Sequence, residues 1–216
     1  MLKSKKIFSL ILTVVMLATT FTAFADSNTN FNRNNAAWYA GNYATSPNPA
    51  YYNYSSVGGD CTNFASQVLR YGGISMTSRK SNPDNTADWY YHGANWPDRT
   101  PSWTDAHYFR GYFGNVNGVG HNHAYAMEKY SVANLKSDFS SIYYDAWEGD
   151  IVQWTTGHDG QTRHSMVVVG YSGGDLQVAY RNAEGYLNTA STSLEDFIDN
   201  LSNSDWITLL RIKNGS

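Results

Sequence analysis

The hydrophobic periodicity of this 216-residue chain changes near Gly149-Asp150, and that change limits the folds the chain can adopt. Before this point apolar residues recur three and four positions apart, which is typical of amphipathic helices. After it, short runs alternate apolar and polar residues, which is typical of half-buried strands. This order indicates an α+β protein whose N-terminal helices pack on an antiparallel sheet. No linker or repeat divides the chain, so we expect one domain.

Capping residues, prolines and glycines give approximate bounds for the elements. The stretch 76–101 has no clear period and predicts a long loop at the rim of a site. Ser172-Gly173-Gly174 predicts a tight hairpin. We expect helices at 32–43, 61–71, 102–113 and 131–139 and a short one beginning near Ser193, with strands at 151–154, 164–171, 176–182 and 206–212.

The first 25 residues have the pattern of a secretory signal peptide. Lys3, Lys5 and Lys6 precede an apolar run, and small residues at 23 and 25 suit a cleavage site. The run is short for a membrane span, so we expect residues 26–216 to be secreted, without stable membrane insertion. Without the three lysines the chain has 12 basic and 18 acidic residues, a net charge of about −6. Nucleic acid is therefore an unsuitable partner.

Cys61 is the only cysteine, and it lies at the start of an expected helix. A single cysteine in an oxidising compartment cannot form an intramolecular disulfide, which favours a role for its reactivity. Gly58 and Gly59 allow a sharp turn, and Asp60 can cap the helix. The helix dipole favours the thiolate, so the pattern predicts a nucleophile. The alternative is a small buried core residue.

A thiol nucleophile needs a base and a group that orients the base. His164 opens a strand and is the predicted base. A three-residue hairpin loop would place Asn182 opposite it, whereas a two-residue loop would bring Arg181 instead. Arginine has no acceptor for the imidazole N–H, so Asn182 is the predicted orienting residue, with Glu184 as its substitute.

The oxyanion hole would combine the Cys61 backbone N–H with a donor from just upstream. Tyr54 and Asn53 are the candidates for that donor, and each is equally consistent with a residue at the rim. Asp60 is a further rim candidate.

Two other classes of function are open. His121 and His123 could ligate zinc, completed by His107, His158 or an aspartate, although no established zinc motif accompanies them. The 17 Tyr and 7 Trp residues could instead form the surface of a non-catalytic extracellular binding module. For the cysteine enzyme we expect no metal and no cofactor.

Several strings of the sequence resemble the bacterial putative amidase domain family, which is related to the papain-like NlpC/P60 cell-wall hydrolases. They include 32–40, 48–51, 58–67, 71–74, Ser102-Trp103, 149–153 and 163–166. The resemblance implies a papain-like fold and an amide or peptide substrate, with peptidoglycan stem peptide as the leading choice by location. It also implies Cys61 as nucleophile and His164 as base. The sequence departs from the family at Tyr180-Arg181-Asn182, where members often have a His-Thr pair.

Overall fold

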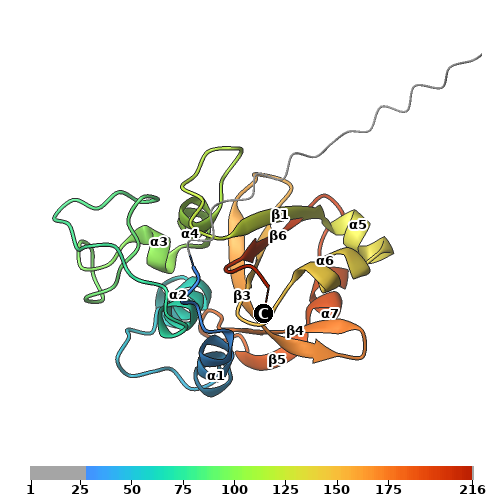
Figure 1. Cartoon of the computed structure of the whole chain (residues 1–216), viewed down its shortest axis with the longest axis horizontal. Coiled ribbons are helices and arrows are strands. Elements are labelled where there is room, and N and C mark those ends of the chain that lie inside the picture. Colours follow the sequence, from blue (N-terminus) through green and yellow to red (C-terminus); the bar gives the residue numbers. More distant parts are fainter. Residues whose placement is uncertain (1–27, 216) are drawn as a thin grey trace, which may run out of the picture.

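A six-stranded antiparallel sheet forms the centre of the protein (Figure 1). The computed structural model describes residues 28–215, so the predicted signal peptide at 1–25 lies outside the described residues. The strand order is β1-β6-β2-β3-β4-β5. The strands are β1 (Ala126–Ser131), β2 (Ile151–Thr155), β3 (Thr162–Ser172), β4 (Asp175–Tyr180), β5 (Thr189–Ser193) and β6 (Trp206–Arg211).

Helices cover both faces of this sheet and enclose two hydrophobic clusters (Figure 1). One cluster joins α1 to α4 with one sheet face, and the other joins α5 to α7 with the opposite face. Between residues 28 and 215, no helix has the length and apolar character to cross a membrane. The helices are α1 (Arg33–Tyr43), the 3-10 turn η1 (Ser55–Val57), α2 (Cys61–Tyr71), α3 (Pro101–Thr104), α4 (Ala106–Phe113), α5 (Val132–Ser137), α6 (Ser140–Asp145) and α7 (Leu194–Asp199).

The α+β class and the antiparallel sheet are confirmed. Three expected helices begin where the sequence has a capping side chain. Asn32, Ser131 and Ser193 each accept a hydrogen bond from a backbone N–H in the first turn of α1, α5 and α7. Such caps satisfy backbone donors that the helix leaves unpaired.

The helix expected at 102–113 is instead two helices. Asp105 has extended backbone angles, φ −111° and ψ 129°, and its side chain caps α4 by accepting from the N–H groups of His107 and Tyr108. Asp105 therefore interrupts the expected helix, so that α3 ends at Thr104 and α4 begins at Ala106. β1, α6 and β5 were not predicted, because their residues lack a strong period of their own and are held by neighbouring elements.

The β3–β4 hairpin has a two-residue loop, not the three-residue loop expected. Gly173 and Gly174 have φ values of 63° and 91°, which suits a tight turn, and Ser172 pairs with Asp175. A register shift between Val168 and Gly170 then inserts one extra residue in β3. Beyond the shift, β3 and β4 pair as a three-residue loop would have paired them, with Val168 opposite Val178. β4 nevertheless ends at Tyr180, before Asn182, so the expected pair of His164 with Asn182 does not form.

Candidate functional site

The turn before Cys61 has the backbone conformation that its glycines predict. Gly58 and Gly59 have φ values of 114° and 122°, which favour residues without a Cβ atom. α2 starts directly afterwards, at Cys61, and packs against β3. The prediction that the helix carrying Cys61 packs on the sheet containing His164 is confirmed.

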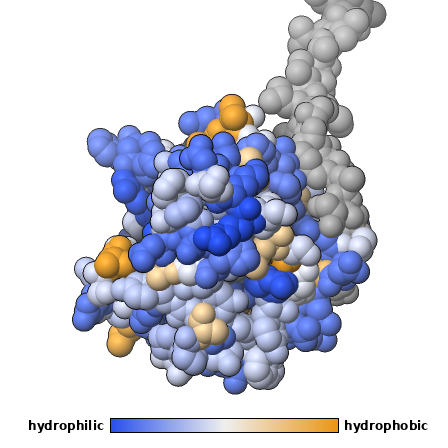
Figure 2. All heavy atoms as spheres, turned by 90° about the vertical axis from the view of Figure 1, so that its left-hand side faces the viewer, coloured by the Kyte–Doolittle hydropathy of each residue, from blue (hydrophilic) through white to orange (hydrophobic). Residues whose placement is uncertain are grey.

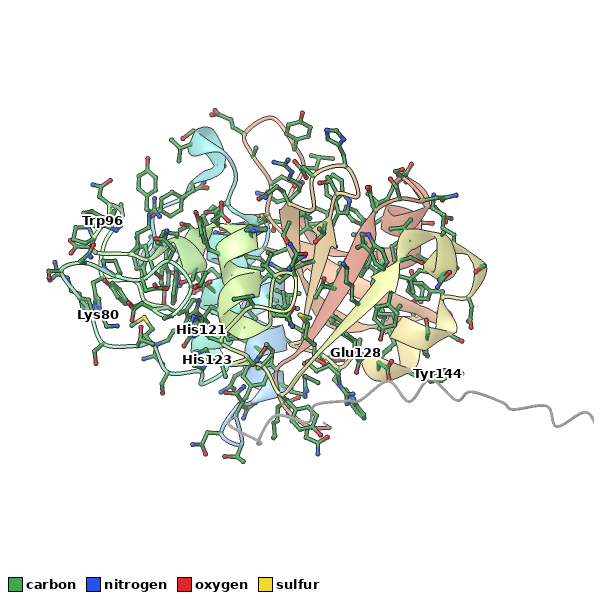
Figure 3. All side chains as sticks on the ribbon, turned by 90° about the horizontal axis from the view of Figure 1, so that it is seen from above. Lys80, Trp96, His121, His123, Glu128 and Tyr144 are labelled. Atoms are coloured by element: carbon green, nitrogen blue, oxygen red, sulfur yellow. The ribbon has the colours of Figure 1, made fainter. Side chains whose placement is uncertain are left out.

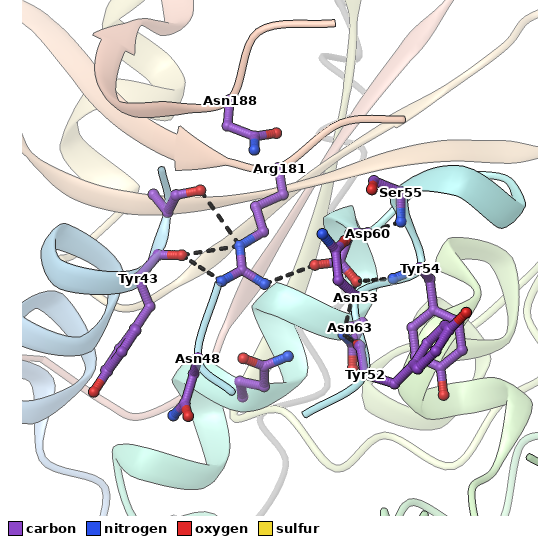
Figure 4. Close-up of polar contacts among 12 residues, drawn as sticks. Tyr43, Asn48, Tyr52, Asn53, Tyr54, Ser55, Asp60, Asn63, Arg181 and Asn188 are labelled. Atoms are coloured by element: carbon purple, nitrogen blue, oxygen red, sulfur yellow. Dashed lines mark hydrogen bonds and ion pairs between the residues drawn. The ribbon is translucent and has the colours of Figure 1, made fainter. Parts of the chain in front are cut away.

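Asp60 is fully buried and fixes this turn through three hydrogen-bond donors (Figure 4). Its Oδ1 accepts from the Tyr54 backbone N–H at 2.9 Å and from Asn63 Nδ2 at 2.7 Å. Its Oδ2 lies 2.7 Å from Nη1 of Arg181, which is 2% exposed. Arg181 also donates to the carbonyl groups of Tyr43 and Ala44 at the end of α1. The ion pair thus joins α1, β4 and the cysteine turn.

Because the Asp60 carboxylate is fully engaged in this way, it makes no capping hydrogen bond to the backbone of α2. The expected cap is therefore wrong, although Asp60 does occupy the N-cap position. The Thr62 backbone N–H donates to the Cys61 sulfur, whereas no hydrogen bond is found for the backbone N–H of Cys61 among residues 28–215. Helix starts of this kind attract negative charge, so the Cys61 N–H can receive a developing oxyanion.

The sulfur of Cys61 contacts Thr62 and Ser165. Its Sγ lies 3.6 Å from Thr62 Oγ1, which in turn lies 2.9 Å from Ser165 Oγ on β3. Burial raises the pKa of the Cys61 thiol, and hydrogen bonds from Thr62 and the Ser165 backbone counteract only part of the rise. The expected net lowering by the helix start is not found. The resting cysteine is a thiol enclosed by protein, although the residue keeps some accessible surface.

His164 follows Thr162 and Arg163 in β3, and its ring packs among aromatic side chains. The ring centroid lies 4.8 Å from that of Tyr180 and 6.0 Å from that of Phe197. Burial lowers the pKa of His164 to about 4. No hydrogen bond joins its ring to Cys61 within the described residues. Ser165, the next residue of β3, contacts the sulfur instead, and the His164 ring packs with Tyr180 and Phe197 of the cluster on the sheet face opposite α2. The expected hydrogen bond between Cys61 and His164 is therefore not formed.

The structure does not place Asn182 as the partner of His164. Its amide Nδ2 donates to the Leu187 carbonyl, and its backbone N–H donates to Asn188 Oδ1 at 2.8 Å. Both bonds stabilise the loop that follows β4, because the strand ends two residues too early for the expected cross-strand pair. Glu184 lies exposed in the same loop, and its backbone N–H donates to the Ser55 carbonyl at 2.8 Å.

The upstream oxyanion candidates are also occupied. The Tyr54 hydroxyl donates to the Ala94 carbonyl at 2.7 Å, and burial raises the pKa of Tyr54 to about 12. Asn53 is exposed and uses Oδ1 to accept from the Ser55 N–H at 3.0 Å. Neither side chain makes a described contact with Cys61, so the backbone donors of α2 are the better oxyanion candidates.

A cleft of about 520 Å³ extends from the turn before Cys61. Gly58 and Gly59 line one end, and Arg99 lies on its wall with its guanidinium carbon 5.0 Å from the Tyr54 ring centroid. This volume falls within the range of pockets that hold small organic ligands. The face that includes α1, α2 and the 76–101 loop is mostly polar, with apolar residues in separate spots (Figure 2). A polar ligand fits such a surface better than an extended apolar partner.

A separate cavity of about 640 Å³ lies near Arg33, Glu148 and Lys213. It is larger than the cleft. Cys61 lines neither of the two, but Gly58 and Gly59 of the turn before Cys61 line the smaller cleft, so we place the candidate site there.

The histidines of the alternative zinc site lie together near α4 (Figure 3). The ring centroids of His121 and His123 are 6.4 Å apart, and His123 also stacks on Tyr112. In the part of the chain from 28 to 215, no group of three or more His, Cys, Asp or Glu residues is arranged to hold a metal ion.

Arg181, the main structural residue of the site, was not predicted as a site residue. It was considered only as a partner for His164 and set aside because it cannot accept a hydrogen bond. Its cationic charge was the available signal, because a buried arginine requires an acidic or carbonyl partner. The Thr62–Ser165 contact had no comparable signal, since it depends on how α2 docks on β3.

Residues 30–205 match the family described as "Putative amidase domain", and the chain belongs to that family. A similar protein is the "Uncharacterized protein YhbB" of Bacillus subtilis (strain 168), which is 28% identical over 156 residues. The alignment covers 72% of this chain but only 42% of that relative. No solved structure matches the chain.

Proposed function

We propose that this protein is a secreted cysteine-dependent amide hydrolase that acts on a peptide of the bacterial cell wall. The observation that carries the proposal is the start of α2, where Cys61 and its unpaired backbone N–H occur together beside a cleft. The family supports hydrolysis of an amide. The expected signal peptide supports export, and the polar cleft suits a peptide substrate.

Cys61 would act as the nucleophile. Its sulfur attacks the carbonyl carbon of the amide, so that a C–S bond forms and the carbonyl oxygen becomes negative. The backbone N–H of Cys61 can stabilise that charge, joined by the Thr62 N–H once it releases the sulfur. The C–N bond then breaks, and the amine leaves with the proton of the thiol. Water hydrolyses the thioester, releasing the carboxylic acid and restoring the thiol.

His164 is the proposed carrier of that proton. Its ring is neutral at pH 7, because its pKa is about 4, and it can therefore accept a proton. The low pKa makes it a weak base in its present surroundings. The proposal requires the ring to leave Tyr180 and Phe197, which lie on the sheet face opposite α2, and to reach Cys61 past the end of β4 when substrate binds. Catalytic hydrogen bonds often form only in the substrate complex.

The test is incubation of the mature protein with purified cell-wall peptides, followed by mass spectrometry of the products. We expect the wild type to release new amine and carboxyl termini and Cys61→Ala to lose turnover by about 10³-fold or more. Circular dichroism of both proteins controls for folding. Equal cleavage by Cys61→Ala would refute the cysteine mechanism. Binding without cleavage would favour the binding module, and turnover that a chelator abolishes would favour zinc.

A further inference from the structure

Arg110 on α4 is a buried cation for which no acidic partner is found among residues 28–215. The residue is 4% exposed, and its Nη1 donates to Thr155 Oγ1 at 2.8 Å. Its Nε is buried and has no hydrogen-bond partner. A guanidinium group has five N–H donors, so most of its capacity is unused. Buried charges are normally paired, so this arrangement indicates a partner that is not part of the chain.

Lys129 on β1 faces the same small cavity. Arg110 and Lys129 line this cavity with Asn115, Asn117, Gly118, Met127 and Thr208, and no acidic residue is in that lining. The Lys129 Nζ lies 4.2 Å from the Trp206 ring centroid. Burial, and then the charge of Arg110, lower the pKa of Lys129. Two cations that repel each other around one cavity create a positive potential that an anion would neutralise.

The size of the cavity restricts the class of ligand. Its volume is about 160 Å³. That volume equals only about five water molecules at roughly 30 Å³ each. Ligands of the size of a drug need about 300 Å³ or more. A peptide or a sugar chain is therefore too large, whereas a tetrahedral oxyanion fits.

We propose that this cavity binds a phosphate group, held by the Arg110 guanidinium and by the Lys129 ammonium. Guanidinium groups suit such anions because two parallel N–H donors can reach two oxygens. β1 begins beside the end of α4 (Figure 1), so the bound anion bridges α4 and the sheet. The site is independent of the proposed amide hydrolysis, because it contains neither Cys61 nor a residue of the cleft.

Isothermal titration calorimetry with inorganic phosphate tests the site, with sodium chloride at the same ionic strength as the reference. We expect saturable 1:1 binding to the wild type and an affinity about tenfold lower or more in Lys129→Gln. Lys129 is exposed at its surface, so this variant is expected to fold. Arg70→Gln removes the same charge from an exposed position on α2 and should bind phosphate as the wild type does.

Arg110→Gln should abolish binding, and Lys129→Gln decides the question if Arg110→Gln does not fold. A small phosphomonoester replaces phosphate in a second titration. Equal binding would identify the phosphate group itself as the ligand, and weaker binding of the ester would restrict the site to free phosphate. No saturable binding to the wild type, or equal loss in Arg70→Gln and Lys129→Gln, would overturn the proposal.

Discussion

His164→Phe separates the packing of this ring from its proposed role as a base. Phenylalanine is similar in size and apolar, so it should pack between Tyr180 and Phe197 without a large cavity or clash. It cannot gain or lose a proton. The two functions of His164 therefore predict effects on two different measurements, stability against pH and turnover.

The magnitude of the stability effect follows from the pKa of His164. The folded-state value is about 4, below the ordinary value of 6.5. The unfolded state therefore binds more protons between these pH values, and stability falls as the pH falls through this window. The difference corresponds to an upper bound of about 3 kcal/mol, fully present above pH 6.5 and lost near pH 4.

Urea unfolding, followed by tryptophan fluorescence from pH 4 to pH 7, measures this effect. We expect the wild type to lose up to about 3 kcal/mol more than His164→Phe on acidification, because only the wild type has the buried imidazole. His158→Phe replaces an exposed histidine and should show the slope of the wild type. Identical slopes for the wild type and His164→Phe would refute the buried, neutral ring.

Turnover of the same variant tests the base. We expect His164→Phe to be folded and to lose activity on wall peptides by about 10²-fold or more, which is the usual contribution of a general base. An active His164→Phe with an altered pH slope would show that the ring only packs in the core. The two measurements can thus fail independently.

Three further predictions follow from single contacts. Arg181→Met should lower the free energy of unfolding by about 3–5 kcal/mol, because it leaves the Asp60 carboxylate buried without its cation. In urea titrations this loss should be smaller in the Asp60→Asn/Arg181→Met double variant. A loss below about 1 kcal/mol in Arg181→Met would contradict the role of the ion pair. Gly157→Ala should destabilise by about 1–3 kcal/mol, because its Cβ would clash with the Ser204 carbonyl oxygen. Gly41→Ala on α1, with open space around it, should stabilise by about 0.5–1 kcal/mol. Thermal unfolding compares the two variants, and a neutral Gly157→Ala would argue against the clash. Iodoacetamide should label Cys61 slowly at pH 7 and faster as the pH rises beyond 9, because burial raises the pKa of the thiol. Rapid labelling at a rate that is constant between pH 6 and pH 8 would instead indicate a preformed thiolate.

Local signals in the sequence were sufficient for much of the fold. The change of period near Gly149 predicted the α+β class. The apolar period after Asn32 predicted α1, and the cap at Ser193 predicted the start of α7, because both signals depend only on neighbouring residues. The glycines before Cys61 likewise predicted the turn, since their positive φ values are a property of the local backbone.

Contacts between distant segments decided the rest. The extra residue in β3 and the early end of β4 removed Asn182 from the sheet, and neither depends on a local signal alone. Asp60 pairs with Arg181, 121 positions away, and this contact diverts the carboxylate from capping α2.

The state of Cys61 is also a tertiary property. From the sequence, the start of a helix predicted a lowered pKa. The docking of α2 on β3 encloses the sulfur and raises the pKa instead, because desolvation of the thiolate outweighs the hydrogen bonds from Thr62 and the Ser165 backbone. The sequence by itself determined which residue can be the nucleophile, whereas only the tertiary structure decided that its resting form is the thiol, since the cost of desolvation depends on every group packed around the sulfur.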